Sequence, residues 1–190
     1  MLIISQNLSN YNFPVPENVV YRINLAWVND LTELKTILSK HKNHSIFLDL
    51  PINRTKPPNN NYSISDLVPI LEANSNVKYL AISNVNSKSD LNEYVDTIPK
   101  QIIIVPKIES PIGVSNIDEI VSSLDYSERV IMLDHDDLYS ALTKLGEPPS
   151  KFKDYVNKLI KYCDEKNVVL LRTVGVIFSS EEKRVTQYIK

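Results

Sequence analysis

Short apolar, β-branched segments alternate along this chain with amphipathic segments of helical periodicity. Such alternation is typical of strand and helix units repeated around a parallel sheet, and it argues against a helical bundle or an all-β sandwich. We therefore predict an α/β fold. The expected strands are residues 2–5, 19–25, 46–50, 77–82, 101–107, 130–133 and 168–173, and the expected helices are residues 30–40, 65–72, 89–97, 114–124, 150–165 and 180–189.

Two architectures fit seven such strands, an open doubly wound sheet and most of a (β/α) barrel. The 190 residues fall below the roughly 200 that a full barrel usually needs. Polar side chains nevertheless gather at the carboxyl ends of the predicted strands, which converge on one mouth in a barrel. We predict a truncated TIM-type barrel, formed as one domain by residues 1–190. The strand-end residues are Arg22, Asn24, Asp49, Lys107, Glu109, Asp137 and Thr173.

Composition limits the partners and the chemistry. Lysine and arginine total 21 against 23 acidic residues, a net charge of −2 that gives no general attraction to nucleic acid. The apolar runs are too short to cross a membrane, and the single cysteine, Cys163, and the absence of a signal-like start predict an intracellular, cytoplasmic chain. The three glycines are too scattered for a phosphate-binding loop, and the histidine spacings fit no common zinc site.

The segment around Lys107 carries most of the chemical information. Lys107 and Glu109 alternate at a strand end and so point to the same side of the sheet. Asp137 follows the next strand and could meet Glu109 across a small gap. Two carboxylates open to water suit Mg²⁺ or Mn²⁺, and a nearby lysine could stabilise an enolate or a transferring phosphoryl group. A solvated ion pair is the alternative interpretation of the same spacing.

These residues also resemble a known family. KIESPIGVSNIDEI (107–120) followed by DHDDL (134–138) is similar to the pyruvate kinase pattern KIEN-x-x-GV-x-NIDEI followed by RGDLG, within the phosphoenolpyruvate and pyruvate barrels. Four further blocks resemble pyruvate kinase in the same order over residues 19–176. They are YRINLAW (21–27), IFLDLPINRT (46–55), YLAISNVNSKSDL (79–91) and NKLIKYCDEKNVVLLRTV (157–174).

The resemblance implies a set of roles. It implies Glu109 and Asp137 as ligands of Mg²⁺ or Mn²⁺, Lys107 as the catalytic lysine and Thr173 near the methyl face of pyruvate. It also implies catalytic and substrate-binding roles for a second group of residues. That group comprises Arg22 as a phosphate ligand, Asn24 and Asp49 at a monovalent-cation site, Arg54 at the arginine of the family's IRT sequence, and His135 as a pocket donor in place of the family's arginine.

The departures from the family pattern bear on function. Only KPPNNNYS (56–63) stands where pyruvate kinases have a lid domain that closes on nucleotide, which disfavours phosphoryl transfer to ADP. Ala26 and Leu50 replace hydroxyl ligands of the cation site, which puts a monovalent cation in doubt. Asp136 and Tyr139 replace glycines whose backbone amides approach the substrate carboxylate in the family. Asp136 also adds negative charge where an anion would bind.

The sequence therefore leaves three functions open. The leading one is a Mg²⁺- or Mn²⁺-dependent enzyme, a lyase or transferase, that acts on pyruvate, oxaloacetate, phosphoenolpyruvate or a related oxoacid through an enolate. The second is a non-catalytic binding or assembly module with a pyruvate kinase-like barrel, and the third is phosphoryl transfer to a nucleotide. A homodimer is expected in each case, because an incomplete barrel leaves strand edges that need cover.

Overall fold

The computed structural model describes residues 3–6, 15–53, 57–58, 60–176 and 185–189, and beyond residue 172 it describes the backbone only. One sheet runs in the order β1 to β8. Strands β1 to β7 are parallel to their neighbours, and β8 returns antiparallel to β7. The strands are β1 (Ile3–Ser5), β2 (Val20–Asn24), β3 (Ser45–Leu50), β4 (Val77–Ile82), β5 (Ile103–Ile108), β6 (Val130–Leu133), β7 (Val169–Val176) and β8 (Val185–Ile189).

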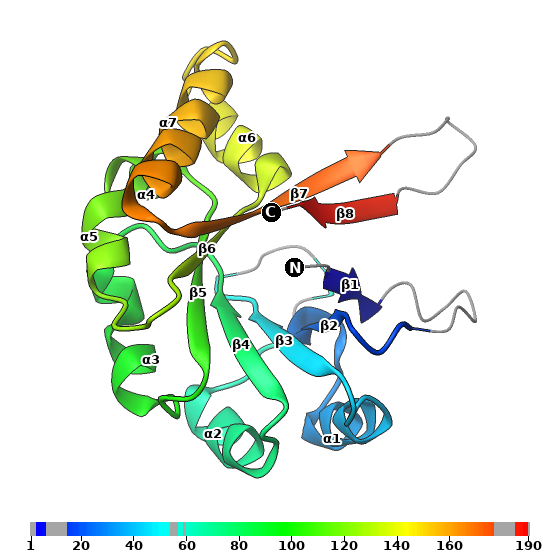
Figure 1. Cartoon of the computed structure of the whole chain (residues 1–190). Coiled ribbons are helices and arrows are strands. Elements are labelled where there is room, and N and C mark those ends of the chain that lie inside the picture. Colours follow the sequence, from blue (N-terminus) through cyan, green and yellow to red (C-terminus); the bar gives the residue numbers. More distant parts are fainter. Residues whose placement is uncertain (1–2, 7–14, 54–56, 59, 177–184, 190) are drawn as a thin grey trace.

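The seven parallel strands curl into a half-barrel with the helices on its outer side (Figure 1). The end strands β1 and β8 approach each other, but no backbone pairing joins them among the described residues. The helices are α1 (Leu31–Lys40), α2 (Ile64–Ala73), α3 (Asn92–Thr97), α4 (Pro111–Ser115), α5 (Ile117–Ser122), α6 (His135–Lys144) and α7 (Lys151–Lys166), and the 3-10 turns are η2 (Leu25–Trp27) and η3 (Lys88–Leu91).

Side-chain alternation along the strands divides the core into two layers. Outward residues such as Ile23, Leu48 and Leu80 are fully buried against the helices. Inward residues such as Phe47 and Met132 form a separate apolar cluster inside the curl. Because successive strand residues face opposite sides, the same inward positions continue toward the carboxyl ends of the strands, where the side chains become polar.

Side-chain caps start several helices directly after a strand or a short loop. The Asp30 carboxylate accepts the Glu33 N–H at 2.8 Å at the start of α1, and the Ser110 hydroxyl accepts the Gly113 N–H at 3.0 Å at the start of α4. Asp134 caps α6 in the same way. Each cap satisfies donors that a helix N-terminus leaves unpaired. The strand-to-helix connections at the carboxyl edge therefore have defined geometry.

The α/β prediction is confirmed, and all seven expected strands occur within a few residues of their predicted ends. One helix prediction was wrong, and one helix was missed. Residues 185–189 of the expected last helix form β8, whose VTQYI sequence is rich in residues that favour strands. Helix α6 was not predicted at all, although Asp134 is a favourable N-cap and Leu138 and Leu142 recur at helical spacing on its buried face.

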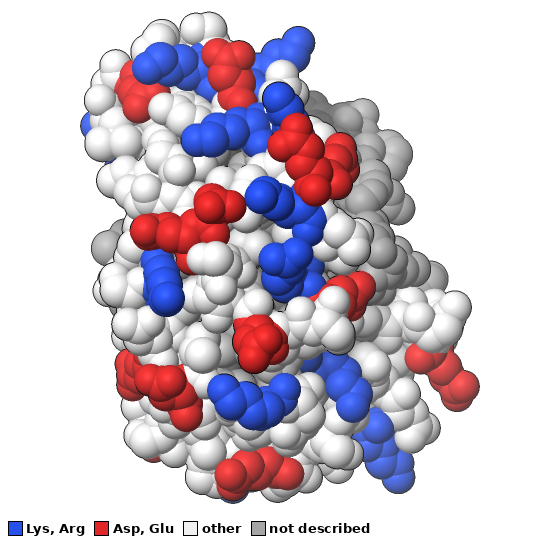
Figure 2. All heavy atoms as spheres, turned by 60° about the vertical axis from the view of Figure 1, so that its left-hand side comes forward, with Lys and Arg blue, Asp and Glu red and all other residues white. Residues whose placement is uncertain are grey.

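The outer helical face carries both signs of charge. Figure 2 shows lysine and arginine side chains interspersed with aspartate and glutamate over the described part of this face. Within the described residues, no helix is both long enough and apolar enough to cross a membrane.

Gly113 allows α4 to lie close to the loop after β4. A Cβ atom at this position would lie 2.6 Å from the Val85 carbonyl oxygen, which is backbone and cannot swing away. Helix α4 begins two residues after Glu109, so this close approach also fixes the end of β5. Glycine is required here by space and not by an unusual φ.

We predict that Gly113→Ala destabilises the fold by about 1–3 kcal/mol, the usual cost of overpacking a buried site. Urea unfolding followed by circular dichroism measures this change. Ser115→Ala, on the exposed side of the same helix, is the matched control and should cost about 0.5 kcal/mol or less. Equal stabilities for Gly113→Ala and the wild type would contradict the close packing.

Candidate functional site

Lys107 is the centre of a buried polar cluster at the carboxyl edge of the sheet. Its side chain comes from β5 and only 6% of the residue is exposed. The Nζ atom lies 2.8 Å from Glu109 Oε1 and 3.4 Å from Asp49 Oδ1, and it donates to the Ser83 hydroxyl at 3.2 Å. One ammonium group thus joins the ends of β3, β4 and β5. The Lys107–Glu109 ion pair, which the alternative interpretation placed in solvent, is buried.

Arg22 of β2 adds a second cation to this cluster. Its guanidinium is ion-paired and hydrogen-bonded to the second carboxylate oxygen of Asp49. Asp49 is only 2% exposed, and its two carboxylate oxygens pair with Arg22 and Lys107. Two cations and two carboxylates, those of Asp49 and Glu109, balance one another in this layer. Such balance is needed because an uncompensated charge is very costly to bury.

The electrostatics of the cluster set the protonation of its members. Burial alone raises the pKa of Asp49, but Lys107 and Arg22 outweigh it and hold that pKa below its ordinary value. Burial alone lowers the pKa of Lys107, but Asp49 and Glu109 raise it more, so the amine stays protonated. Burial raises the pKa of Glu109 above its ordinary value, because Lys107 and the Asn84 N–H offset only part of the desolvation.

Asn84 orients Glu109 from the loop after β4. Its backbone adopts a left-handed conformation with φ of 58°. Its N–H donates to Glu109 Oε2 at 2.7 Å, and its side-chain amide donates to the Ile52 carbonyl at 2.7 Å. Asparagine tolerates this backbone region better than most residues. Asn84 was not predicted as a site residue, because a role carried by a backbone N–H leaves little trace in residue type.

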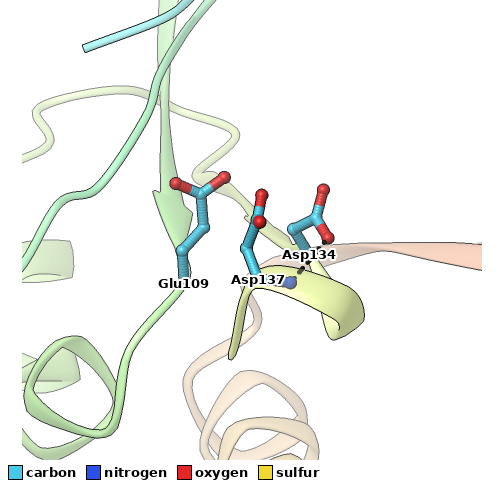
Figure 3. A group of neighbouring side chains, drawn as sticks. All are labelled: Glu109, Asp134 and Asp137. Atoms are coloured by element: carbon cyan, nitrogen blue, oxygen red, sulfur yellow. Dashed lines mark hydrogen bonds between the residues drawn. The ribbon is translucent and has the colours of Figure 1, made fainter. Parts of the chain in front are cut away.

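Three carboxylates converge beside this cluster. Glu109, Asp134 and Asp137 each offer an oxygen, and these three atoms lie within 4.8 Å of one another. Figure 3 shows Glu109 at the end of β5 and the two aspartates at the start of α6, with the three carboxyl groups side by side. The structure thus brings the predicted pair of Glu109 and Asp137 together and adds Asp134.

Asp134 was missed as a site residue. It lies two positions after the inward-facing Met132, so strand alternation carried one residue past the end of β6 would have placed it inside the barrel mouth. One of its oxygens accepts the Asp136 and Asp137 N–H groups at 3.2 and 3.3 Å, which positions the carboxylate as the N-cap of α6.

The remaining predicted site residues have other surroundings. The Asn24 side chain accepts the Ala26 N–H at 3.0 Å and caps η2. The His135 ring packs toward Phe152 of α7, with centroids 6.0 Å apart. Thr173 lies in β7 opposite Tyr188 of β8, and its side chain is not among those described. Arg54 lies outside the described residues.

A pocket of about 200 Å³ opens beside the polar cluster. Its floor lies at the strand ends and is lined by Lys107, Glu109, Ser83 and Asn84. One wall is the loop after β3 and the other is helix α6. The residues that line these walls are Pro51, Ile52, Asn53, Asp137, Ser140, Ala141 and Lys144.

No protein-family model and no curated protein matches the sequence. Similar folds occur among the solved structures, including RipC and a pyruvate kinase. RipC from Yersinia pestis aligns with a TM-score of 0.57 at 14% identity, over 88% of this chain and 76% of RipC. Pyruvate kinase from Cryptosporidium parvum, solved in complex with ADP, aligns with a TM-score of 0.56 at 15% identity, over 81% of this chain and 51% of the kinase.

At these identities the likeness shows the fold alone. The chain spans about half the length of the pyruvate kinase. The pyruvate kinase resemblance inferred from sequence blocks is thus supported at the level of the curled parallel sheet.

We predict that Asp49→Asn lowers the free energy of unfolding at pH 7 by about 3–5 kcal/mol, because Lys107 and Arg22 lose the carboxylate between them. The folded-state pKa of Asp49 is lower than its unfolded value near 3.8, so its contribution exists above that pH and is lost as pH falls through the folded-state pKa. The variant should therefore lose less stability than the wild type on acidification.

Urea unfolding between pH 2.5 and pH 7 measures both effects. Asp125→Asn, an exposed acid outside the cluster, serves as the control and should change stability by about 0.5 kcal/mol or less. An Asp49→Asn variant as stable as the wild type at pH 7 would show that the cluster does not depend on this carboxylate.

Proposed function

We propose that this protein is a Mg²⁺- or Mn²⁺-dependent enzyme that acts on pyruvate, oxaloacetate or a related oxoacid through an enolate. One observation carries the proposal. A buried lysine and two of the three converging carboxylates, Glu109 and Asp137, line one pocket at the carboxyl edge of a parallel half-barrel, with Asp134 beside them. That edge is where barrel enzymes place their chemistry. The similarity in fold to a pyruvate kinase agrees with this reading.

The residues fit a hard divalent cation. Mg²⁺ prefers oxygen ligands, and oxygens bound to one such ion lie about 3–4 Å apart. The three donor oxygens of Glu109, Asp134 and Asp137 lie within 4.8 Å of one another, so small side-chain rotations suffice. When bound there, the cation would supply Lewis-acid polarisation of the substrate's oxygens.

The chain's own residues would supply the rest of the chemistry. Lys107 keeps its proton and would place a fixed positive charge beside the oxygen on which negative charge develops. Glu109 would be held in one orientation by Lys107 and by the Asn84 N–H. The Ser83 hydroxyl, which accepts from Lys107, would set the direction of the ammonium group.

A second candidate function is a non-catalytic binding module, and one observation favours it. The Asp136 N–H, at a position where the pyruvate kinase pattern has a glycine amide facing substrate, donates instead to Asp134. The exposed Asp136 side chain also brings a further negative charge to the start of α6. Both features would weaken the binding of a substrate carboxylate at this helix.

The metal site makes a direct prediction. Glu109→Gln and Asp134→Asn should each weaken Mn²⁺ binding more than about tenfold, because each removes one charged ligand. Asparagine is as good an N-cap as aspartate, so Asp134→Asn should leave α6 intact. Isothermal titration calorimetry measures the affinities, and Glu128→Gln, at an exposed position outside the pocket, is the control.

The affinity for Mn²⁺ should also fall as the pH is lowered through the raised pKa of Glu109, because protons compete for that carboxylate. No Mn²⁺ binding to the wild type at millimolar concentration would contradict the metal site.

Catalysis is tested by the exchange of pyruvate methyl protons with solvent. We expect the wild type with Mg²⁺ to accelerate this exchange without any nucleotide, and Lys107→Met to slow it by about a hundredfold, the usual effect of removing one group that stabilises an oxyanion. Proton NMR in D₂O follows the exchange, and circular dichroism checks that the variant is folded. A wild-type rate equal to that of Mg²⁺ alone would favour the binding module.

A further inference from the structure

One face of helix α6 lines the pocket along its full length. The lining residues are Asp137, Ser140, Ala141 and Lys144, at positions i, i+3, i+4 and i+7 of a single helix. This spacing is that of one helical stripe. The stripe begins with an acid of the metal-candidate cluster and ends with a lysine. The stripe therefore carries opposite charge at its two ends.

The length of this stripe limits the size of the ligand that could contact both of its charged ends. Seven residues of α-helix span about 10.5 Å along the axis. Helical side chains lean back toward the N-terminus, so the long Lys144 side chain can reach toward the acids and shorten this gap by several Å. The remaining distance matches a short diacid better than pyruvate, whose only carboxylate would be used at the cation end.

The rest of the pocket agrees with a second anionic group near Lys144. Ser140 offers a hydroxyl donor between the two ends, and Asn53 offers a side-chain amide from the opposite wall. The Asn84 amide ties the two loops that form this wall and the floor, through its 2.7 Å hydrogen bond to the Ile52 carbonyl. Among the described lining residues, the acids are Glu109 and Asp137, both at the cation end.

We propose that Lys144 and Ser140 form a subsite for the second carboxylate of a 2-oxo dicarboxylic acid, so that the protein selects diacids over monoacids. This inference rests on the proposed function, because the first carboxylate and the oxo group would bind at the cation end. It goes further by assigning specificity to residues that take no part in the chemistry.

The test compares two stable acids of equal chain length, 2-oxoglutarate and 2-oxopentanoate, which differ in the terminal carboxylate. Calorimetry with the full chain and saturating Mg²⁺ should show 2-oxoglutarate binding about tenfold or more tightly, the usual strength of a hydrogen bond to a charged group. Lys144→Gln removes the charge and leaves a polar side chain that is one atom shorter, and it should bring the two affinities within about twofold.

Controls separate specificity from structure. Lys35→Gln, which removes a charge from exposed α1, should keep the preference for the diacid. A lysine that only interacts with the C-terminal end of its helix would change stability and leave the ratio of the two affinities unchanged. Lys144→Gln should leave Mn²⁺ affinity unaltered, since Lys144 is not among the three candidate metal ligands.

The possible failures differ from one another. Equal binding of both acids to the wild type, or a diacid preference that survives Lys144→Gln, would overturn the subsite and leave the metal-dependent function standing. Mn²⁺ binding without binding of either acid would overturn both proposals.

Discussion

The structure at the barrel mouth depends on one requirement, that the buried ammonium of Lys107 be neutralised. An isolated charge at this depth would be too costly, so the carboxylates of Asp49 and Glu109 must come close to it. Asp49 in turn forms an ion pair with Arg22. The ends of β2, β3 and β5 are thereby held in one arrangement, and Ser83 adds β4. Packing of apolar residues alone would not fix these strand ends so specifically.

The inward-facing positions of the strands are apolar in the middle of the half-barrel and charged at its carboxyl end. Phe47, Val105 and Met132 point inward and form an apolar layer. Two residues further along each strand or its extension, the inward positions are Asp49, Lys107 and Asp134. Strand periodicity therefore stacks a charged layer directly on an apolar one. The apolar layer excludes water from below, which strengthens every electrostatic interaction in the layer above it.

Individual residues show which parts of the fold and of the candidate site could be predicted from the sequence. Period-two alternation was sufficient to put Lys107 and Glu109 on one side of β5. The β/α repeat alone left an open sheet possible, and the barrel-like curvature was predicted from the polar residues at the strand ends. Asp134 and Asn84 were missed because they act from the first residues beyond a strand, where a cap or a backbone N–H does the positioning. Strand β8 was missed because its pairing with β7 is a tertiary contact that local helical periodicity does not report.

Stability alone does not explain the charged layer. Buried ion pairs can often be replaced by apolar residues of similar volume without loss of stability, and the layer beneath shows that apolar residues pack well inside this curl. Within the cluster, Arg22 and Lys107 balance Asp49 and Glu109, and beside it lie two further acids, Asp134, which caps α6, and Asp137. After burial itself, the nearby Asp134 also raises the pKa of Glu109, so ionisation of Glu109 becomes more costly. Under the proposed function, a bound divalent cation would offset that cost and give the acidic cluster a role beyond folding.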